Sequence, residues 1–260
     1  MFSILTKRHR FDLLIELVKT NFKMRYQNSV LGVLWVLIKP YATFAVMYVV
    51  WTRIVNVDIP NYQLYLLSGI ILFSYFNELI LLGQMSLLDN AHIILKVNFP
   101  RQIVVLSTML SGLINLGINL IFFIVIAVIS GVQFTYGSVL YFIFIVGIIF
   151  LFAMGVSFFT SVISIRFRDL KNIFELGIIL LQWVTPVFYA VSSNLFSGRT
   201  SDYIAANPLG IVINQGRAAF DIYGTKNISL MIIYFIISFI IFLIGWRYFN
   251  KSVKKVAEHF

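Results

Sequence analysis

Few residues of this chain could carry chemistry of their own, and their types exclude the commonest kinds of active site. The sequence contains no cysteine, so it offers neither a disulfide nor a thiolate metal ligand. Its three histidines, His9, His92 and His259, are too far apart for the spacing of a metal site. It has neither a G-x-x-x-x-G-K-[S/T] phosphate loop nor a recognisable Ser–His–Asp set. We therefore predict a protein that is not an enzyme and that holds no metal and no cofactor of its own.

Two charged residues stand out because they lie inside apolar runs of membrane length. Lys39 follows the start of the first run, and Glu78 precedes the end of the second. Ionisable side chains at membrane depth are costly, and they usually face a cavity or pair with one another. Two antiparallel neighbouring helices would bring these residues to a similar depth. The sequence thus predicts an intramembrane ion pair between Lys39 and Glu78.

The elements that must position these residues are membrane-spanning helices. The chain of 260 residues is 60% hydrophobic and only 12% charged, whereas a soluble domain is roughly 25% charged. A helix needs about 20 apolar residues to cross the hydrocarbon core of a membrane. Apolar runs of this kind cover residues 31–53, 62–83, 103–131, 138–165, 172–192 and 228–249. We predict an all-α integral membrane protein in which residues 1–260 form one domain with six transmembrane helices.

Lysine and arginine are distributed unequally between the two sides of these runs. Fifteen of the twenty lie on the side that carries both chain ends, four lie on the other side, and the remaining one is Lys39. Because cytoplasmic loops of membrane proteins are enriched in Lys and Arg, both termini are predicted to be cytoplasmic. This asymmetry accounts for the net charge of +10, which does not indicate binding to nucleic acid.

Two segments flanking the runs are predicted to lie at the membrane surfaces. Residues 11–27 form an amphipathic helix in which Glu16 and Lys19 are spaced to pair. This helix could be a simple lipid-surface anchor or a lever docked on a cytoplasmic partner. Residues 193–220 are interrupted at Asn207 and Pro208, which favours two short helices dipping into the outer leaflet over a plain loop.

A third segment, residues 84–102, is too polar to be embedded in lipid. We predict a cytoplasmic helix there that begins at Ala91, after Asp89 and Asn90, and ends at Pro100. Such a helix, held by two spans, could transmit force from a soluble partner, although a structured loop without a partner is the alternative. Pro186, in the fifth run, is expected to kink its helix.

Polar and small residues recur at helical spacing within the third and fourth runs. The polar stripe of the third run consists of Ser107, Ser111, Asn115 and Asn119. It could form hydrogen bonds between helices or be the hydrophilic wall of a pathway. The small residues of the fourth run are Ala153, Ser157 and Ser161, whose spacing predicts close helix packing.

Four short motifs, in their order along the chain, resemble one known family. They are MRYQNSVLGVLWVLIKP at 24–40, FRDLKNI at 167–173, QWVTPVFY at 182–189 and NPL at 207–209. With the six runs and the chain length, they make the sequence similar to the membrane subunits of ABC exporters for polysaccharides. Residues 59–76 look most similar to exporters of O-antigen, the O-chain of lipopolysaccharide. Permeases for capsule and teichoic acid export are similar as well.

The resemblance implies properties that the residues alone do not show. It implies a homodimer in the bacterial inner membrane, bound to two copies of a separate ATPase subunit that holds ATP and Mg²⁺. The substrate would be a polysaccharide linked to undecaprenyl diphosphate, and membrane lipids would surround the spans. Residues 11–27 and 84–102 would dock the ATPase, and 193–220 would be re-entrant periplasmic gate helices. Lys39 departs from the family pattern, in which an uncharged residue precedes this proline.

Candidate site residues follow from the aromatic content, the charges and this resemblance. The substrate pathway is expected to use aromatic rings, which stack on sugars: Trp35, Tyr41, Phe44, Tyr48, Trp51, Phe73, Tyr75, Phe76, Trp183 and Tyr189. Contacts to the lipid diphosphate are expected from Arg25, which could equally be a headgroup-level anchor, and from Lys39, which could instead pair with Glu78. Coupling to the ATPase is expected from Glu16, Lys19, Asp89, His92, Lys96, Arg166, Arg168 and Asp169.

Other classes of function fit the sequence less well. An ABC exporter of drugs or lipids would usually have a longer extracellular region or a fused ATPase domain. An ion-coupled transporter would need more deeply placed carboxylates than Glu78, and a membrane transferase would need a catalytic cluster. Residues 24–40 join the surface helix to the first span, so we predict a hinge at Gly32 that links the ATPase contact to the pathway.

Overall fold

The computed structural model describes the chain except for residues 1–6, 28, 56, 58, 98, 168, 191–201, 203, 204 and 257–260. Within the described residues, every element of regular structure is a helix or a helical turn. In chain order these are α1 (Lys7–Tyr26), η1 (Gly32–Leu34), α2 (Trp35–Val49), η2 (Val50–Ile54), α3 (Tyr62–Asp89), α4 (Ala91–Ile94), α5 (Gln102–Ile129), α6 (Tyr136–Arg166), α7 (Leu170–Val184), α9 (Pro208–Ala218) and α10 (Ile228–Val256). This confirms the predicted all-α class.

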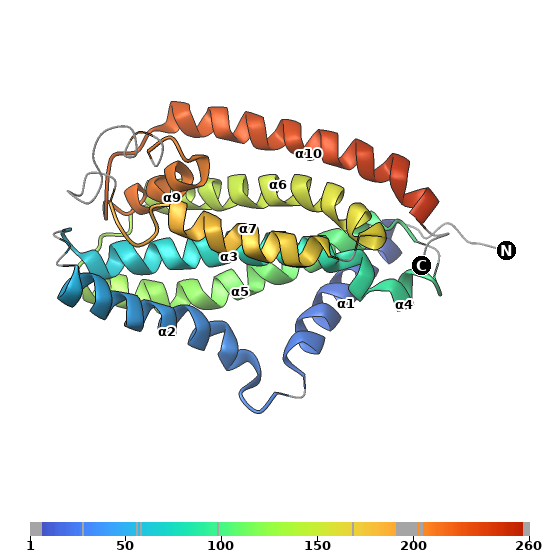
Figure 1. Cartoon of the computed structure of the whole chain (residues 1–260), viewed down its shortest axis with the longest axis horizontal. Helices are drawn as coiled ribbons and strands as arrows, with labels where there is room; N and C mark the ends of the chain where they lie inside the picture. The colour runs from blue at the N-terminus through green and yellow to red at the C-terminus, as the bar shows by residue number, and fades with distance from the viewer. Residues whose placement is uncertain are drawn as a thin grey trace.

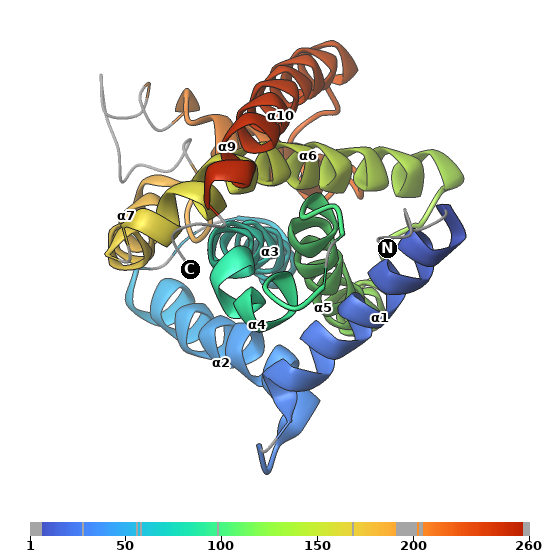
Figure 2. The ribbon, with the colours of Figure 1, turned by 90° about the vertical axis from the view of Figure 1, so that its right-hand side faces the viewer.

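The bundle is built around α3. This helix packs against α6, α5, α2, α9 and α7, and the view along the bundle shows it enclosed by its neighbours (Figure 2). The most apolar stretch of α3 is 72% buried, whereas that of α10 is 17% buried. The outer helix α10 packs mainly on α6, and α1 packs mainly on α5. The core therefore lies along α3, and the outer helices leave broad apolar faces for lipid or for other protein.

In the part of the chain that the structure describes, five helical stretches are long and apolar enough to cross a membrane: Gly32–Ile54, Tyr62–Asp89, Gln102–Ile129, Tyr136–Arg166 and Ile228–Val253. They coincide with five of the six predicted runs, and the chain is a multi-pass membrane protein. The first stretch joins η1, α2 and η2 into one rod, with Pro40 inside α2.

The predicted helix over 172–192 is shorter in the structure and contains no proline kink. α7 has 15 residues and ends at Val184, which gives it a length of about 22 Å. Thr185 has an extended backbone, with ψ at 132°. The proline ring of Pro186 disfavours helical geometry at the preceding residue, so the proline ends this helix instead of bending it.

The segment 84–102 also differs from the prediction. α3 continues to Asp89, and the separate helix α4 begins at Ala91, as expected, but stops at Ile94 and not at Pro100. Asn90 makes the break with φ at −103° and ψ at 16°, and its side-chain amide donates to the Ser86 carbonyl at 2.9 Å. The Asn90 backbone amide also donates to this carbonyl, at 3.3 Å, so the residue closes the end of α3 with two hydrogen bonds to Ser86.

Of the two helices predicted in 193–220, the structure describes the second as α9. Asn207 caps it by accepting hydrogen bonds from the backbone amides of Leu209 and Gly210, and Pro208 occupies the first turn. These are favoured residues for a helix start. The first of the two predicted helices was expected on residues 203–206, of which 203 and 204 lie outside the described residues.

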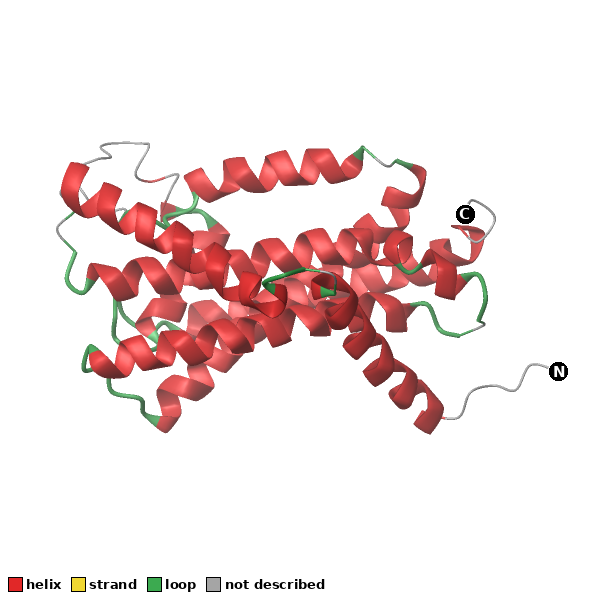
Figure 3. Ribbon diagram, turned by 90° about the horizontal axis from the view of Figure 1, so that it is seen from below, coloured by secondary structure: helices red, strands yellow, loops and turns green. Residues whose placement is uncertain are grey.

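The ends of the bundle differ in what they carry. The start of α1, the short α4 and the ends of α6 and α10 lie at one end of the molecule, and α9 lies toward the other (Figure 1). α1 leaves the bundle at an angle and forms a V with α2 (Figure 1), and the view from below shows it pointing away from the other helices (Figure 3). The bend of this V joins the C-terminal end of α1 to the first predicted span.

Small residues let α6 approach both α3 and α10. Ala153, Ser157 and Ser161 are fully buried, which confirms their predicted packing role. The pattern missed a second close crossing, between Gly155 of α6 and Gly245 of α10. A Cβ at Gly155 would lie 2.7 Å from the Phe242 backbone nitrogen, and one at Gly245 would lie 2.3 Å from the Gly155 carbonyl.

Replacing Gly155 by alanine is expected to push α10 away from α6. Because the contact is with backbone, which cannot rotate aside, we expect a loss of about 1–3 kcal/mol in the free energy of unfolding. The matched control is Gly147→Ala on the same helix, where a Cβ meets nothing within 4 Å. Thermal unfolding of the purified protein measures the stability of both variants. Equal melting temperatures for Gly155→Ala and Gly147→Ala would contradict this crossing.

Candidate functional site

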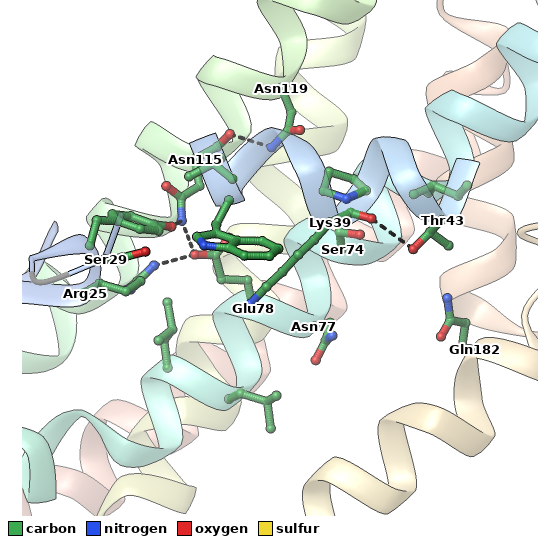
Figure 4. A pocket seen from close by; sticks show the side chains of 17 residues that line it. Arg25, Ser29, Lys39, Thr43, Ser74, Asn77, Glu78, Asn115, Asn119 and Gln182 are labelled. Carbon is green, nitrogen blue, oxygen red and sulfur yellow. Dashed lines mark hydrogen bonds and ion pairs between the residues drawn. The ribbon is translucent and has the colours of Figure 1, made fainter. Parts of the chain in front are cut away.

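A cavity of about 680 Å³ lies where the tip of α1, α2, α3, α5 and α7 face one another (Figure 4). Polar side chains make up much of its lining: Arg25, Ser29, Lys39, Thr43, Ser74, Asn77, Glu78, Asn115, Asn119 and Gln182. Most of these residues stand on helices long enough to cross a membrane. Polar side chains at that depth usually mark a hydrophilic cavity or a pathway.

An ion pair between Arg25 and Glu78 fixes one wall of this cavity. Arg25 Nη1 lies 2.5 Å from Glu78 Oε1, and Arg25 Nη2 donates to Ser111 Oγ at 3.1 Å. The amide of Asn115 donates both to Glu78 and to the Tyr26 hydroxyl (Figure 4). Burial raises the pKa of Tyr26, which keeps this hydroxyl neutral. The prediction that Glu78 pairs with Lys39 is corrected, because α1 folds back and places Arg25 on the carboxylate.

Lys39 reaches toward the same cavity from α2 (Figure 4). It makes no ion pair with any residue that the structure describes, and its side chain is exposed. Glu78 is the one acid among the described lining residues, so two cations face a single carboxylate. An unpaired ammonium on a membrane-length helix is costly, and the cavity has an excess positive charge that suits an anionic ligand.

The polar stripe of α5 serves both of the roles left open by the sequence. Its first half forms hydrogen bonds between helices: Asn21 of α1 donates to Ser107 and Thr108 at 3.2 and 3.3 Å, and Ser111 accepts from Arg25. Its second half, Asn115 and Asn119, lines the cavity. The stripe therefore fastens α1 to the bundle and then continues as a wall.

Three buried amides leave acceptors unused in this cavity. The side-chain oxygens of Asn77, Asn115 and Asn119 have no hydrogen-bond partner among the described residues. Buried polar atoms without a partner are rare in native proteins and call for an explanation such as water or a ligand. The hydroxyl groups of water or of a ligand could donate hydrogen bonds to all three of these amide oxygens.

The predicted pathway aromatics divide into several groups. Trp35 lines the cavity, and Tyr41 donates its hydroxyl to the Asn119 carbonyl at 3.2 Å. Rings of the first predicted span contact other rings in tilted geometry: Phe44 contacts Tyr48 of the same span, and Trp51 contacts Tyr189 from the segment after α7. Four of the ten rings belong to the core and not to an open surface: Phe73, Tyr75, Phe76 and Tyr189. Trp183, at 54% exposure, faces outward.

The predicted coupling residues gather at the end of the molecule that carries α4 and the start of α1 (Figure 1). Glu16 and Lys19 form the expected pair at 2.9 Å, and both are 67% exposed. The other described members are exposed as well: Asp89, His92, Lys96, Arg166 and Asp169. Arg168 lies outside the described residues. The arrangement gives a polar surface that another protein could contact.

Arg217 is a key residue that sequence reasoning counted only as a loop charge. It is completely buried in α9, and its guanidinium donates to the carbonyls of Tyr65, Pro186 and Val187 at 3.1, 2.9 and 2.8 Å. It also lies 3.5 Å from the centre of the Tyr65 ring. The sequence contains Arg217 after Asn207-Pro208, but it does not show that this side chain is buried.

Two of the three carbonyls that Arg217 binds, those of Pro186 and Val187, belong to the irregular segment after α7. Tyr62 donates its hydroxyl to the Phe188 carbonyl and Tyr65 donates to the Tyr189 carbonyl, both at 2.7 Å. Non-helical backbone within a membrane must find hydrogen-bond partners inside the protein. Arg217 and the two tyrosines supply them, so α9 and α3 hold this segment in place.

An all-helical, multi-pass architecture with a cationic, amide-lined cavity is typical of a transport permease. The family model described as ABC-2 type transporter matches residues 12–220. Two proteins named O-antigen export system permease protein RfbA from Klebsiella pneumoniae are 34% identical over 254 residues and 32% identical over 252 residues. Each of these alignments covers 95% of this chain and 95% of the relative. A protein of the same name from Myxococcus xanthus is 28% identical over 208 residues, 80% of each chain.

The chain belongs to the ABC-2 type transporter family. This confirms the resemblance drawn from the motifs, since the relatives are permeases of O-antigen export and the similarity runs over nearly the whole length. A permease of this kind is a transmembrane subunit and not an enzyme.

Proposed function

We propose that this chain is the transmembrane subunit of an ATP-driven exporter that moves a polysaccharide linked to undecaprenyl diphosphate across the bacterial inner membrane. O-antigen is the proposed cargo. The observation that carries the proposal is the 34% identity, over 95% of both chains, to an O-antigen export permease. Two permease chains form the pathway, and two copies of a separate ATPase subunit supply the energy.

In the proposed topology, α7 and the irregular segment after it make the sixth crossing. α7 begins at the end of the bundle that carries α4 and runs alongside its longer neighbours (Figure 1). The buried carbonyl contacts of Pro186 to Tyr189 let the chain continue without a helix. An even number of crossings puts both termini on one side, and the Lys and Arg distribution makes that side cytoplasmic. α9 is then a periplasmic gate helix that re-enters the membrane.

The cavity is the proposed entry site for the lipid-linked end of the substrate. Phosphate groups suit it for two reasons: Lys39 has no ion-pair partner among the described residues, and Arg25 has a planar fork that binds phosphate oxygens in pairs. The unused amide oxygens of Asn77, Asn115 and Asn119 suit sugar hydroxyls, which donate hydrogen bonds. Trp35 adds a ring on which the first sugar can stack.

The proposed coupling runs through α1 and the bend that follows it. The exposed Glu16–Lys19 face of α1 and the charges around α4 would contact the ATPase. The inner face of α1 is bonded to α5 through Asn21 and Arg25, so movement of α1 acts directly on the cavity. Gly32 stands between α1 and α2 with φ at +49°, in the left-handed region that favours glycine.

Replacing Gly32 by leucine is expected to uncouple ATP hydrolysis from export while the complex still assembles. A residue with a Cβ in the left-handed region costs about 1–2 kcal/mol, so the bend would shift to another geometry. ATPase activity of the purified complex and surface polysaccharide are measured together. The control is Gly137→Ala at the start of α6, where a Cβ meets nothing within 4 Å. Normal export by Gly32→Leu would rule out the hinge.

The proposed function is tested by deletion and complementation in the native host. Loss of the gene should abolish surface O-antigen and leave the lipid-linked polymer inside the cell, and the intact gene should restore export. The tagged permease should co-purify with an ABC ATPase. If surface O-antigen persists while a capsule or teichoic acid disappears, the cargo is wrong. If no ATPase co-purifies and all surface glycans persist, the exporter assignment fails.

A further inference from the structure

A second pocket, of about 410 Å³, opens between the last turns of α6 and α10. Two cations line it, Arg166 at the end of α6 and Lys251 on α10. Tyr248 and Ser252 bring hydroxyl groups from α10, and Val162 and Phe167 add an apolar wall from the α6 side. This pocket shares no residue with the cavity around Glu78.

Neither cation of this pocket has an acidic partner among the described residues. In the part of the chain that the structure describes, Arg166 and Lys251 form no ion pair, and no acidic residue lines the pocket. Both side chains are exposed, so they can reach an outside ligand. Tyr248 is held in place by stacking on Phe159, with ring centres 5.1 Å apart. Two positive charges beside one pocket repel each other, and an anion bound between them would offset this repulsion.

The pocket lies where the helices leave the apolar part of the membrane. The apolar sequence of α10 gives way to Trp246-Arg247-Tyr248, and Lys251 follows one turn later. Aromatic and basic residues in this order are typical of the headgroup level of a membrane. Exposed apolar side chains of α10, such as Ile240, Leu243 and Ile244, continue from that level toward the membrane centre.

We propose that the Arg166–Lys251 pocket binds the phosphate of an anionic phospholipid, such as phosphatidylglycerol, with the acyl chains lying along α10. A soluble anion would use the two charges alone, whereas a phospholipid uses the charges, the hydroxyls and the apolar wall together. Basic pockets between helices on the cytoplasmic side are known to suit lipid headgroups. The site does not depend on the proposed export function, and it gives Arg166 a lipid contact in place of the predicted ATPase contact.

The test measures binding of phosphatidylglycerol to the purified full-length permease by native mass spectrometry, with phosphatidylcholine of the same chain length as the neutral lipid. Each basic residue near a membrane surface contributes roughly a fivefold preference for anionic lipid. Arg166→Gln or Lys251→Gln should therefore weaken phosphatidylglycerol binding about fivefold, and the double variant about 30-fold. Binding of phosphatidylcholine should not change.

The matched control is Arg247→Gln, which removes the same charge from α10 at a position that does not line the pocket. Because it does not line the pocket, it should weaken phosphatidylglycerol binding less than either Arg166→Gln or Lys251→Gln. In detergent alone the double variant should melt at the same temperature as the unchanged protein, and added phosphatidylglycerol should raise the melting temperature of the unchanged protein only.

Three outcomes would overturn the proposal. The double variant could bind phosphatidylglycerol as tightly as the unchanged protein. Glycerol phosphate, a headgroup without acyl chains, could displace the lipid completely, which would make the ligand a soluble phosphate. The double variant could also keep its lipid but lose the co-purifying ATPase, which would make the pocket a protein contact.

Discussion

Replacing Arg217 by methionine is expected to lower the free energy of unfolding by roughly 3–5 kcal/mol. The guanidinium is completely buried and donates to three backbone carbonyls, those of Tyr65, Pro186 and Val187. Methionine fills a similar volume but donates nothing, so the Val187 carbonyl loses this donor and the Pro186 carbonyl keeps only the long bond of 3.4 Å from the Tyr65 hydroxyl, whereas the Tyr65 carbonyl still accepts from Ser68 Oγ at 3.0 Å. Buried acceptors that lose their partner cost about 1–3 kcal/mol each.

The measurement is the midpoint of thermal or denaturant unfolding of the purified permease. The stability of Arg217→Lys should lie between that of Arg217→Met and that of the unchanged protein, because an ammonium keeps the charge but cannot reproduce the planar fork that reaches three carbonyls. A methionine variant as stable as the unchanged protein would show that the irregular segment after α7 does not depend on Arg217.

Gly69→Ala tests the same contact from the facing helix. A Cβ on this α3 residue would lie 2.1 Å from Arg217 Nη2 and 2.9 Å from the Val187 carbonyl. The guanidinium has little room to move, since it is completely buried and bonded to three backbone carbonyls. The variant should lose stability, whereas Gly117→Ala on α5, with nothing within 4 Å, should not.

Much of the fold could be predicted because its signal is local. Apolar runs of membrane length define five helices, and the spacing of Ala153, Ser157 and Ser161 correctly indicated a packed face. The end of α7 could have been predicted from Pro186 alone, since a proline restricts the residue before it. The fifth run, residues 172–192, misled because apolar composition does not distinguish a helix from buried irregular backbone. What decides between them is the distant Arg217, which supplies the missing hydrogen bonds.

The site shows the same division between local and distant signals. Glu78 was identified from its position inside an apolar run, and the stripe from Ser107 to Asn119 from its helical spacing. The partner of Glu78 was mistaken because both Lys39 and Arg25 are close to it in depth. The choice depends on the angle at which α1 folds back over α5, and that angle is set by the bonds of Asn21 to Ser107 and Thr108. No pattern within a single helix contains it.

Replacing Arg25 by alanine is expected to lower export by roughly 10- to 100-fold, the range that corresponds to losing one hydrogen bond to a charged group. The proposed function requires Arg25 to leave Glu78 when phosphate arrives, because one guanidinium cannot hold both ligands with the same fork. Glu78 is then a stand-in anion that keeps the cavity ordered between substrates. Export is measured as surface polysaccharide, and folding as the melting temperature of the purified protein.

The charge swap Arg25→Glu with Glu78→Arg separates the two roles of the pair. The swapped residues can re-form the ion pair between α1 and α3, so the melting temperature should recover. Export should remain low, because the cation no longer stands on α1 beside the entrance. The control swap is Lys171→Glu with Glu175→Lys, an exposed pair on α7 at 3.8 Å, which should affect neither quantity. If export recovers together with stability, Arg25 serves only to dock α1, and Lys39 is left as the cation available to bind the phosphate.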